Sequence, residues 1–433
     1  MSLKSISAII GDLAKAQPDW PAISHETMSI TRLELHQSTN RLARAYQGLG
    51  VQEGDFVTIA LPNSIEFYQA CIATWKLGAT PQPISAKLPR VEQIAIVSLA
   101  EPALLVGSGA DLALGVQTLP ANFMPDPALS DADLPDKVSR FWKAPTSGGS
   151  TGRPKIIVSE IPGCFDFSQD KPLQQEFDRA QLVPGPLYHN GPFSFSMNGL
   201  FLGNHIVVMT RFDAEQTLAL IEAHNIDWMM MVPTMMSRIW KLPDEIRLKY
   251  DLSSLRVMLH LAAPCPPWLK EKWIDWLGGD RIHELFGGTE GTGATWITGD
   301  EWLAHRGSVG KLLGGAKVKV VNEQGETLPD GEIGEIYLLP PGGQGSTYHY
   351  IGAESSGLDG GWESLGDMGY VDSQGYLYLS DRKTDMILAG GANIYPAEIE
   401  AAIDTHPLVR SSAVIGLPDD DLGQSVHAIV DAA

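Results

Sequence analysis

Segments with the character of β-strands alternate with amphipathic helical segments along roughly the first 260 residues of the chain. Runs of apolar and β-branched residues lie at 56–61, 103–106, 156–158, 205–209, 228–232 and 256–260. Apolar residues at helical spacing lie at 31–50, 64–77, 214–224 and 234–241. Because strands that alternate with helices pair through helical crossovers, the pattern predicts an α/β fold of stacked, largely parallel sheets with helices on their faces.

The pattern changes after about residue 300. Short strand-like runs at 317–321, 333–339 and 376–380 are separated by turn-forming segments rich in Asn, Asp and Gly. Such spacing is typical of hairpins, so a small antiparallel β unit is expected over residues 300–380. A further helix is expected to begin near Pro396, because proline favours the first helical turn.

Composition limits the class of protein. A length of 433 residues suggests two or three domains. With 31 Lys and Arg against 52 Asp and Glu residues, the formal net charge is −21, which disfavours binding to nucleic acids and anionic membranes. No secretion leader and no apolar run of membrane-spanning length is recognisable. The widely spaced Cys71, Cys164 and Cys265 favour a reducing cytoplasm and burial as small apolar residues.

Residues 146–155 form a loop rich in hydroxyl groups and glycines that ends in a lysine. Its members are Thr146, Ser147, Gly148, Gly149, Ser150, Thr151, Gly152, Arg153, Pro154 and Lys155. Glycines let backbone N–H groups approach an anion closely, small hydroxyls add donors, and Lys155 adds positive charge. The loop is therefore a candidate cradle for a polyphosphate, with an ordinary surface loop as the alternative.

Two other templates fit this loop less well. A Walker loop needs a lysine directly after its last glycine, but Arg153 and Pro154 precede Lys155. Residues 148–152 formally match G-x-S-x-G, which would make Ser150 a hydrolase nucleophile. That template needs a helix after the turn, whereas the run at 156–158 indicates a strand. A strand–loop–strand clamp is therefore favoured.

A second glycine-rich segment, at 285–291, contains a single carboxylate, that of Glu290. It is expected to follow a strand that ends near Ile282, at the mouth of a parallel sheet where nucleotides bind. Glu290 is a candidate Mg²⁺ ligand, because Mg²⁺ takes one or two carboxylates together with phosphate oxygens. The alternative is a glutamate at a helix N-terminus. A zinc-protease motif is excluded, since Gly287 stands where the second histidine is required.

Three further polar residues are weaker candidates. Asp367 could accept hydrogen bonds from both ribose hydroxyls, and Arg382 could donate to ribose or phosphate. His189 is a candidate pocket residue. The alternatives are a turn aspartate, a surface arginine in an ion pair and a structural histidine.

In their order and approximate spacing, these segments resemble the motifs of the AMP-forming acyl-adenylate superfamily, which includes acyl-CoA synthetases, aryl-CoA ligases, luciferases and adenylation domains. The resemblance runs from about residue 20 to the last residue and is carried by residues 146–155, 286–290, 364–367, 381–385 and 390–400. Residues 188–191 and 260–267 are most similar to bacterial acyl-CoA synthetases.

The resemblance implies an adenylation domain at 1–381 of stacked αβαβα sheets, with a small antiparallel β-barrel subdomain at about 300–380. An α+β C-terminal lid would begin at 382 and run, incomplete, to 433. The implied reaction has two steps: a carboxylic acid and ATP form acyl-AMP and pyrophosphate, and coenzyme A then displaces AMP. ATP, Mg²⁺ and coenzyme A would be required, and a homodimer is the default oligomer.

The resemblance also implies roles for individual residues. The loop from Thr146 to Lys155 would hold the β- and γ-phosphates, and Thr289 and Glu290 would contact the α-phosphate and Mg²⁺. Asp367 and Arg382 would hold the ribose. The remaining implied positions are Ala262, Ala263, Pro264, Gly287 and Gly288 beside the adenine and acyl pocket, His189 where the acyl site meets the thiol channel, and Thr384 as the hinge of the lid.

The chain departs from the family pattern at several positions. Gly148 replaces a serine, Phe286 a common tyrosine, and Thr384 the usual charged hinge residue. Residue 433 precedes the family's C-terminal lysine motif. Losing one such preorganised cation costs roughly 3 kcal/mol in the transition state, so the chain as written is expected to bind ATP and acyl-AMP but to form acyl-AMP slowly.

Three alternatives stay open at this point. In the first, the chain forms an acyl-adenylate but transfers the acyl group to an amine or to a carrier-protein thiol. In the second, the chain is a hydrolase with Ser150 as its nucleophile. In the third, it is a non-catalytic protein that binds an adenylate. The acid itself is not specified. The bulky residues Phe193, Phe195, Met197 and Trp296 either line a wide apolar acyl pocket or pack in a core.

Overall fold

The structure, a computed structural model, describes residues 3–107, 115–148, 154–167, 172–382, 386–389, 392–406, 408–419 and 423–432. The chain divides into two compact units, and each is described by itself. The first unit comprises Met1–Met231, Lys241–Met258 and Thr347–Glu354. The second comprises Val232–Trp240, Leu259–Ser346 and Ser355–Ala433.

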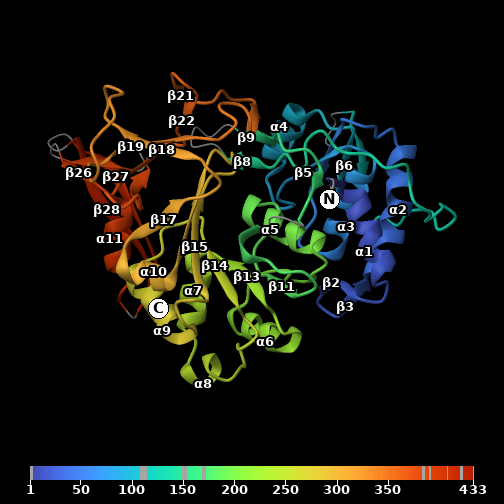
Figure 1. Cartoon of the computed structure of the whole chain (residues 1–433), viewed down its shortest axis with the longest axis horizontal. Coiled ribbons are helices and arrows are strands. Elements are labelled where there is room, and N and C mark those ends of the chain that lie inside the picture. The colour runs from blue at the N-terminus through green and yellow to red at the C-terminus, as the bar shows by residue number, and fades with distance from the viewer. Residues whose placement is uncertain are drawn as a thin grey trace. The chain divides into compact units, whose positions relative to one another are not determined.

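The first unit contains the helices α1 (Ile6–Ala16), α2 (Arg32–Gly48), α3 (Ile65–Lys76), α4 (Arg90–Ala100), α5 (Asn190–Phe201), α6 (Ala214–His224) and α8 (Asp244–Arg247) (Figure 1). Its strands are β1 (Lys4–Ser5), β2 (Pro21–His25), β3 (Met28–Thr31), β4 (Phe56–Ile59), β5 (Thr80–Pro83), β6 (Leu104–Val106), β7 (Gln117–Leu119), β8 (Thr146–Gly148), β9 (Pro154–Ser159), β10 (Cys164–Phe165), β11 (Ala180–Val183), β12 (His205–Val208), β13 (Trp228–Met231) and β20 (Tyr348–Ile351).

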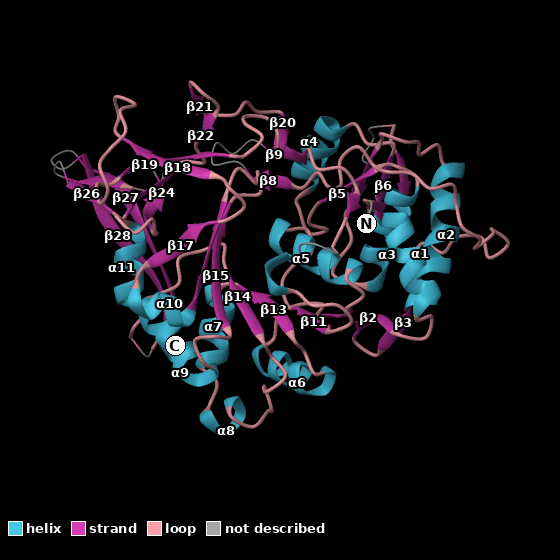
Figure 2. Cartoon of the chain, in the orientation of Figure 1, coloured by secondary structure: helices cyan, strands magenta, loops and turns pink. Residues whose placement is uncertain are grey.

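Parallel pairing dominates the sheets of the first unit, as the alternation of strands and helices predicts. One sheet has the order β5-β4-β6-β7 with all neighbours parallel. In another, β11 pairs in parallel with β12 and β13, and β12 pairs in parallel with β2 (Figure 2). The third sheet, β20-β9-β8, is antiparallel. The predicted α/β class is therefore confirmed.

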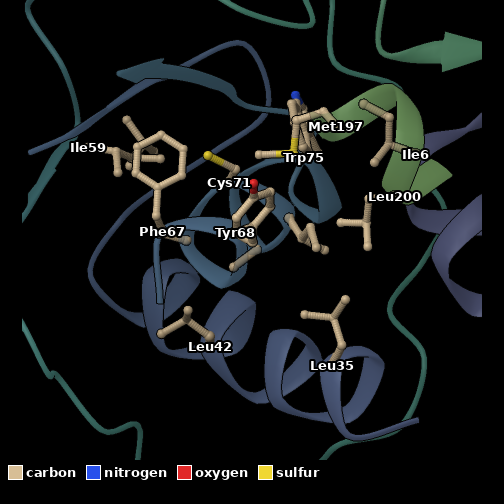
Figure 3. Close-up of a cluster of buried hydrophobic side chains, with 14 of the residues drawn as sticks. Ile6, Leu35, Leu42, Ile59, Phe67, Tyr68, Cys71, Trp75, Met197 and Leu200 are labelled. Carbon is tan, nitrogen blue, oxygen red and sulfur yellow. The ribbon is translucent and has the colours of Figure 1, made fainter. Parts of the chain in front are cut away.

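The core of the first unit forms around α3, which lies beside α1 and α2 (Figure 1). Phe67, Tyr68, Cys71 and Trp75 of α3 are almost completely buried and meet side chains from the neighbouring helices (Figure 3). The Ser64 side chain caps α3 by accepting a hydrogen bond from the backbone N–H of Phe67 at 3.2 Å. Apolar spacing and a hydroxyl cap thus fix the position of this helix.

The structure decides between the two alternatives for Phe193 and Met197 and corrects the expectation that all three cysteines are buried. Phe193 and Met197 of α5 are fully buried in this core, so they pack rather than line a pocket. Of the three cysteines only Cys71 is buried; Cys164 and Cys265 are half-buried, because Cys164 lies in the short pair β1–β10 and Cys265 in a loop.

The second unit contains the helices α7 (Pro233–Trp240), α9 (Pro267–Leu277), α10 (Gly299–Ala304) and α11 (Pro396–Ile403). Strand β14 (Val257–His260) begins in the first unit and ends in the second. The other strands are β15 (Ile282–Gly287), β16 (Ala294–Thr298), β17 (Ser308–Leu312), β18 (Lys317–Val321), β19 (Gly334–Leu339), β21 (Gly357–Leu358), β22 (Trp362–Glu363), β23 (Asp367–Val371), β24 (Leu377–Arg382), β25 (Ile387–Ala389), β26 (Ala392–Ile394), β27 (Val409–Asp419) and β28 (Gly423–Ala432).

Antiparallel pairing dominates the second unit, as predicted for residues after about 300. Strand β18 pairs with β19, β19 with β23, and β23 with β24, all antiparallel. Figure 2 shows β18 and β19 side by side. The last segments form a four-stranded sheet, β26-β25-β28-β27, with α11 packed on β27. Helix α11 begins at Pro396, as predicted. The domain boundary near residue 381 stays a prediction.

None of the helices in the described ranges combines the length and the apolar character needed to cross a bilayer.

Candidate functional site

The glycine- and hydroxyl-rich loop connects two antiparallel strands, β8 and β9. Ser147 pairs with Lys155, and Gly148 pairs with Pro154. The strand predicted after the loop is thus confirmed, and the helix that a hydrolase elbow would need is replaced by β9. Gly149, Ser150, Thr151 and Gly152 lie outside the described residues.

Both ends of this loop are held by residues that sequence reasoning missed. Thr146 Oγ1 accepts a hydrogen bond from Nε2 of the fully buried Gln82 at 2.8 Å. Lys155 Nζ donates to the hydroxyl of Tyr350 at 2.9 Å and lies 4.0 Å from the centre of its ring. Because β20 pairs with β9 across almost two hundred residues of sequence, no local pattern indicates the contact with Tyr350.

In the second unit, the segment around Glu290 differs from the prediction in its backbone. Strand β15 begins at Ile282, where a strand end was expected, and continues to Gly287. On one side it pairs antiparallel with β16, and Gly287 lies opposite Ala294. Thr289 and Glu290 form a turn after β15, so the alternative of a helix N-terminus is wrong. Glu290 is buried, with 7% of its surface exposed.

Two segments that are distant in sequence meet at Gly288. A Cβ atom placed on Gly288 would clash with Cδ1 of Leu365 and lie 2.9 Å from Oε2 of Glu290. Leu365 belongs to the turn that leads into β23, where Gly366 has a φ of +84°. The structure therefore brings the segment of Thr289 and Glu290 against the segment that carries Asp367.

Asp367 and Arg382 lie opposite each other. Asp367 begins β23, Arg382 ends β24, and the antiparallel register pairs the two positions. The turn before Asp367 is held by Ser364, whose hydroxyl donates to Oε1 of Glu335 at 2.7 Å and accepts from the Gly366 N–H at 3.0 Å. Residues opposite each other in a sheet are close neighbours, so the backbone places the two residues predicted to contact the ribose next to each other.

The loop of Ala262, Ala263 and Pro264 connects β14 to α9 and is exposed. Ala262 has a φ of +76°, in the left-handed region that favours glycine. This backbone is the feature of the loop that the residue types do not predict.

Beneath this loop lies a buried polar cluster that sequence reasoning missed. Lys270 Nζ of α9 contacts Oε2 of Glu284 of β15 at 2.5 Å, and Nε2 of His260 lies 4.0 Å from the same oxygen. Burial raises the pKa of Glu284, although Lys270 opposes the change. Burial and the nearby Lys270 lower the pKa of His260 well below its usual value, so its imidazole is neutral.

His189 lies in the first unit, directly before α5, with an extended backbone. It is exposed, and partial burial of its ring lowers its pKa, so the imidazole is neutral at pH 7. The next residue, Asn190, accepts a hydrogen bond from the ammonium of the buried Lys143. The sequence signal was a lysine among the apolar residues at 141–144, shortly before the phosphate loop, because a charged residue in such a run needs polar partners.

Within the described ranges, no group of three or more His, Cys, Asp or Glu residues could hold a metal ion. Glu290 is a buried carboxylate beside Gly288, which has no side chain to fill the space. One carboxylate is enough for a Mg²⁺ ion that arrives with a nucleotide, since Mg²⁺ takes its other ligands from phosphates and water. Thr384 lies outside the described residues.

Comparison with known proteins places these features in a wider group. A family model described as "AMP-binding enzyme" matches residues 12–348. A 2-succinylbenzoate–CoA ligase of Bacillus cereus is 28% identical over 423 residues, which cover 95% of this chain and 86% of that protein. A feruloyl-CoA synthase of Amycolatopsis is 29% identical over 435 residues, covering 96% and 86%. The structure of o-succinylbenzoate CoA synthetase from Bacillus subtilis, in complex with an acyl-adenylate intermediate, matches the fold with a TM-score of 0.84 at 24% identity, covering 99% and 89%.

Proposed function

Because the chain belongs to the family of AMP-binding enzymes, we propose that it is an ATP-dependent ligase that joins a carboxylic acid to coenzyme A. In the first step, a carboxylate oxygen attacks the α-phosphorus of ATP, which forms acyl-AMP and releases pyrophosphate. In the second step, the sulfur of coenzyme A attacks the acyl carbon, the thioester forms, and AMP leaves. The observation that carries the proposal is the meeting of the Glu290 turn with the Leu365 turn at Gly288.

Most of the predicted site residues are assigned a role in nucleotide binding. The loop from Thr146 to Lys155 binds the β- and γ-phosphates through backbone N–H groups and hydroxyls. Thr289 binds the α-phosphate, and Glu290 binds Mg²⁺, which neutralises charge on the phosphate oxygens. Asp367 and Arg382 bind the ribose from neighbouring strand positions. The loop of Ala262 to Pro264, with Gly287 and Gly288, borders the adenine.

His189 acts at the acid side of the site. A neutral imidazole there accepts a proton or a hydrogen bond without adding charge beside the acid. Thr384 is the hinge about which the C-terminal segment reorients between the two steps.

The decisive experiment measures pyrophosphate release by the full chain with ATP, Mg²⁺ and a panel of carboxylic acids, with and without coenzyme A. Acid-dependent pyrophosphate release, followed by coenzyme A-dependent thioester formation, is the expected result. Thioester formation with a carrier protein or amide formation with an amine, in place of coenzyme A, would reassign the acceptor. Absence of any acid-dependent release from ATP would overturn the proposal.

The setting of the enzyme follows from its charge and substrates. We infer that it works in the cytoplasm on small molecules rather than on nucleic acids or membranes, and that it forms a homodimer. Light scattering of the purified full chain tests the oligomeric state.

A further inference from the structure

Lys143 is a buried cation three residues before the phosphate loop. Its ammonium donates to Oδ1 of Asn190 and to Oγ of Ser194 at 2.6 Å, and lies 4.5 Å from the centre of the Trp142 ring. Only 7% of the residue is exposed, and in the described part of the chain it forms no ion pair with a carboxylate. A charge in such a place is stabilised by the polar groups it contacts, which makes the orientation of those groups important.

These contacts fix the orientation of the Asn190 side chain. An ammonium has only donors, so the atom of the amide that faces it must be the oxygen. Ser194 Oγ, which accepts from Lys143, donates its own proton to the same Oδ1 at 3.0 Å. With both acceptor sites of Oδ1 occupied, Nδ2 must point away from Lys143 and Ser194. Among the described residues, this amide nitrogen has no acceptor.

Asn190 stands next to the residue that the proposed function places beside the acid. Asn190 is half-buried and is the first residue of α5, directly after His189. The ammonium on the oxygen side of the amide withdraws electron density, which strengthens the N–H groups as donors. The N-terminus of α5 adds positive potential at the same place. Each of these effects favours the binding, beside the Asn190 amide nitrogen, of an oxygen atom that carries negative charge or an available lone pair.

We propose that Asn190 determines substrate specificity by donating a hydrogen bond from Nδ2 to an oxygen of the acid other than its reacting carboxylate. The enzyme then prefers acids that carry a carbonyl, a hydroxyl or a second carboxylate over the corresponding hydrocarbon acids. Lys143 and Ser194 are positioning residues that keep the amide in this orientation. The inference rests on the proposed function, because it takes His189 to lie beside the acid.

Matched pairs of acids test the proposal. Pyrophosphate release is measured with heptanoate and pimelate, cinnamate and hydroxycinnamate, and phenylbutanoate and its keto derivative. The assays are run below pH 7, where Lys143 stays charged. The wild type is expected to prefer the oxygenated member of each active pair by about 10- to 100-fold in kcat/KM, since an unpaired polar group in the site penalises the other member. Asn190→Leu should remove this preference by slowing only the oxygenated acid.

Two further variants separate specificity from folding. Asn198→Leu, on the same helix, is the matched control and should keep the wild-type preference. Lys143→Met should lower the preference in the same direction as Asn190→Leu while kcat for the hydrocarbon acids stays unchanged, a split that a merely structural role would not give.

The outcomes are distinguishable. If the wild type turns over acids but Asn190→Leu keeps the same preference, or if only the KM for ATP changes, the specificity proposal is wrong and the proposed function stands. If no acid supports pyrophosphate release in the wild type, the proposed function fails and the specificity proposal fails with it.

Discussion

Glu290 is a buried carboxylate in a turn whose neighbour, Gly288, has no side chain. Replacing it by glutamine keeps its shape and removes its charge, so the Mg²⁺ that we propose it holds would lose its carboxylate ligand. We expect Glu290→Gln to slow pyrophosphate release by about 100-fold and to shift the Mg²⁺ dependence to higher concentration. Glu323→Gln, in an exposed turn, is the control. Equal rates for Glu290→Gln and wild type at every Mg²⁺ concentration would exclude this role.

Gly288 is the residue at which two turns touch. The Cβ of Gly288→Ala would push against Leu365 and approach the carboxylate of Glu290. We expect KM for ATP to rise about 10-fold, and the double substitution Gly288→Ala with Leu365→Ala to recover part of the loss, because it relieves the clash with one partner. Gly48→Ala, where no atom lies within 4 Å of the new methyl group, should have no effect. A double variant no better than the single one would show that Leu365 is not the obstacle.

Lys143 makes the stability of the protein depend on pH. Burial lowers its pKa from 10.5 to about 7, so between these values the unfolded chain binds more protons than the folded chain. Stability should therefore rise as the pH increases from 7 towards 10.5, by up to about 1.4 kcal/mol per pH unit near the middle of this range. Urea unfolding at several pH values measures the slope. Lys143→Met should flatten it, and an unchanged slope in that variant would contradict the assignment.

At the scale of elements, the pair of Lys270 and Glu284 joins α9 to β15 through the interior of the second unit. Removing one partner leaves the other charge buried. We therefore expect Lys270→Met to destabilise the second unit by about 3 kcal/mol, and Lys270→Met with Glu284→Leu to recover most of it. Thermal unfolding of the single and double variants gives the comparison. If the double variant is as unstable as the single one, packing rather than charge accounts for the loss.

Elements with local signals were predictable from the sequence. The β-branched run after Pro154 gave β9, and helix α3 (Ile65–Lys76) lies within the range 64–77 predicted from apolar spacing. The extent of β15 was missed because the glycines after Phe286 suggested a loop, whereas pairing with β16 extends the strand to Gly287. The contacts of Thr146 with Gln82 and of Lys155 with Tyr350 could not be predicted, since they depend on which strands become neighbours.

At the scale of the whole molecule, a net charge of −21 surrounds a site that must attract anionic ATP. At low ionic strength this field repels the nucleotide, and salt screens it over a Debye length of about 10 Å at 0.1 M. We expect kcat/KM for ATP to rise by about 2- to 5-fold between roughly 0.01 and 0.1 M NaCl, with kcat unchanged. Steady-state kinetics at saturating acid and coenzyme A measures this. If kcat/KM for ATP instead fell steadily with salt, attraction by the basic groups around the phosphate loop (residues 146–155) would dominate the approach of ATP.

The left-handed backbone at Ala262 has a consequence for the loop that we propose borders the adenine. A methyl group in this conformation carries strain of roughly 1–2 kcal/mol relative to the ordinary helical region, yet it also limits the shapes that the free loop can sample. A nucleotide that binds there contacts a loop whose conformation is already restricted, so the loop loses little further conformational freedom on binding. The same conformation leaves little tolerance for β-branched residues, so natural variation at this position should favour glycine, asparagine and aspartate.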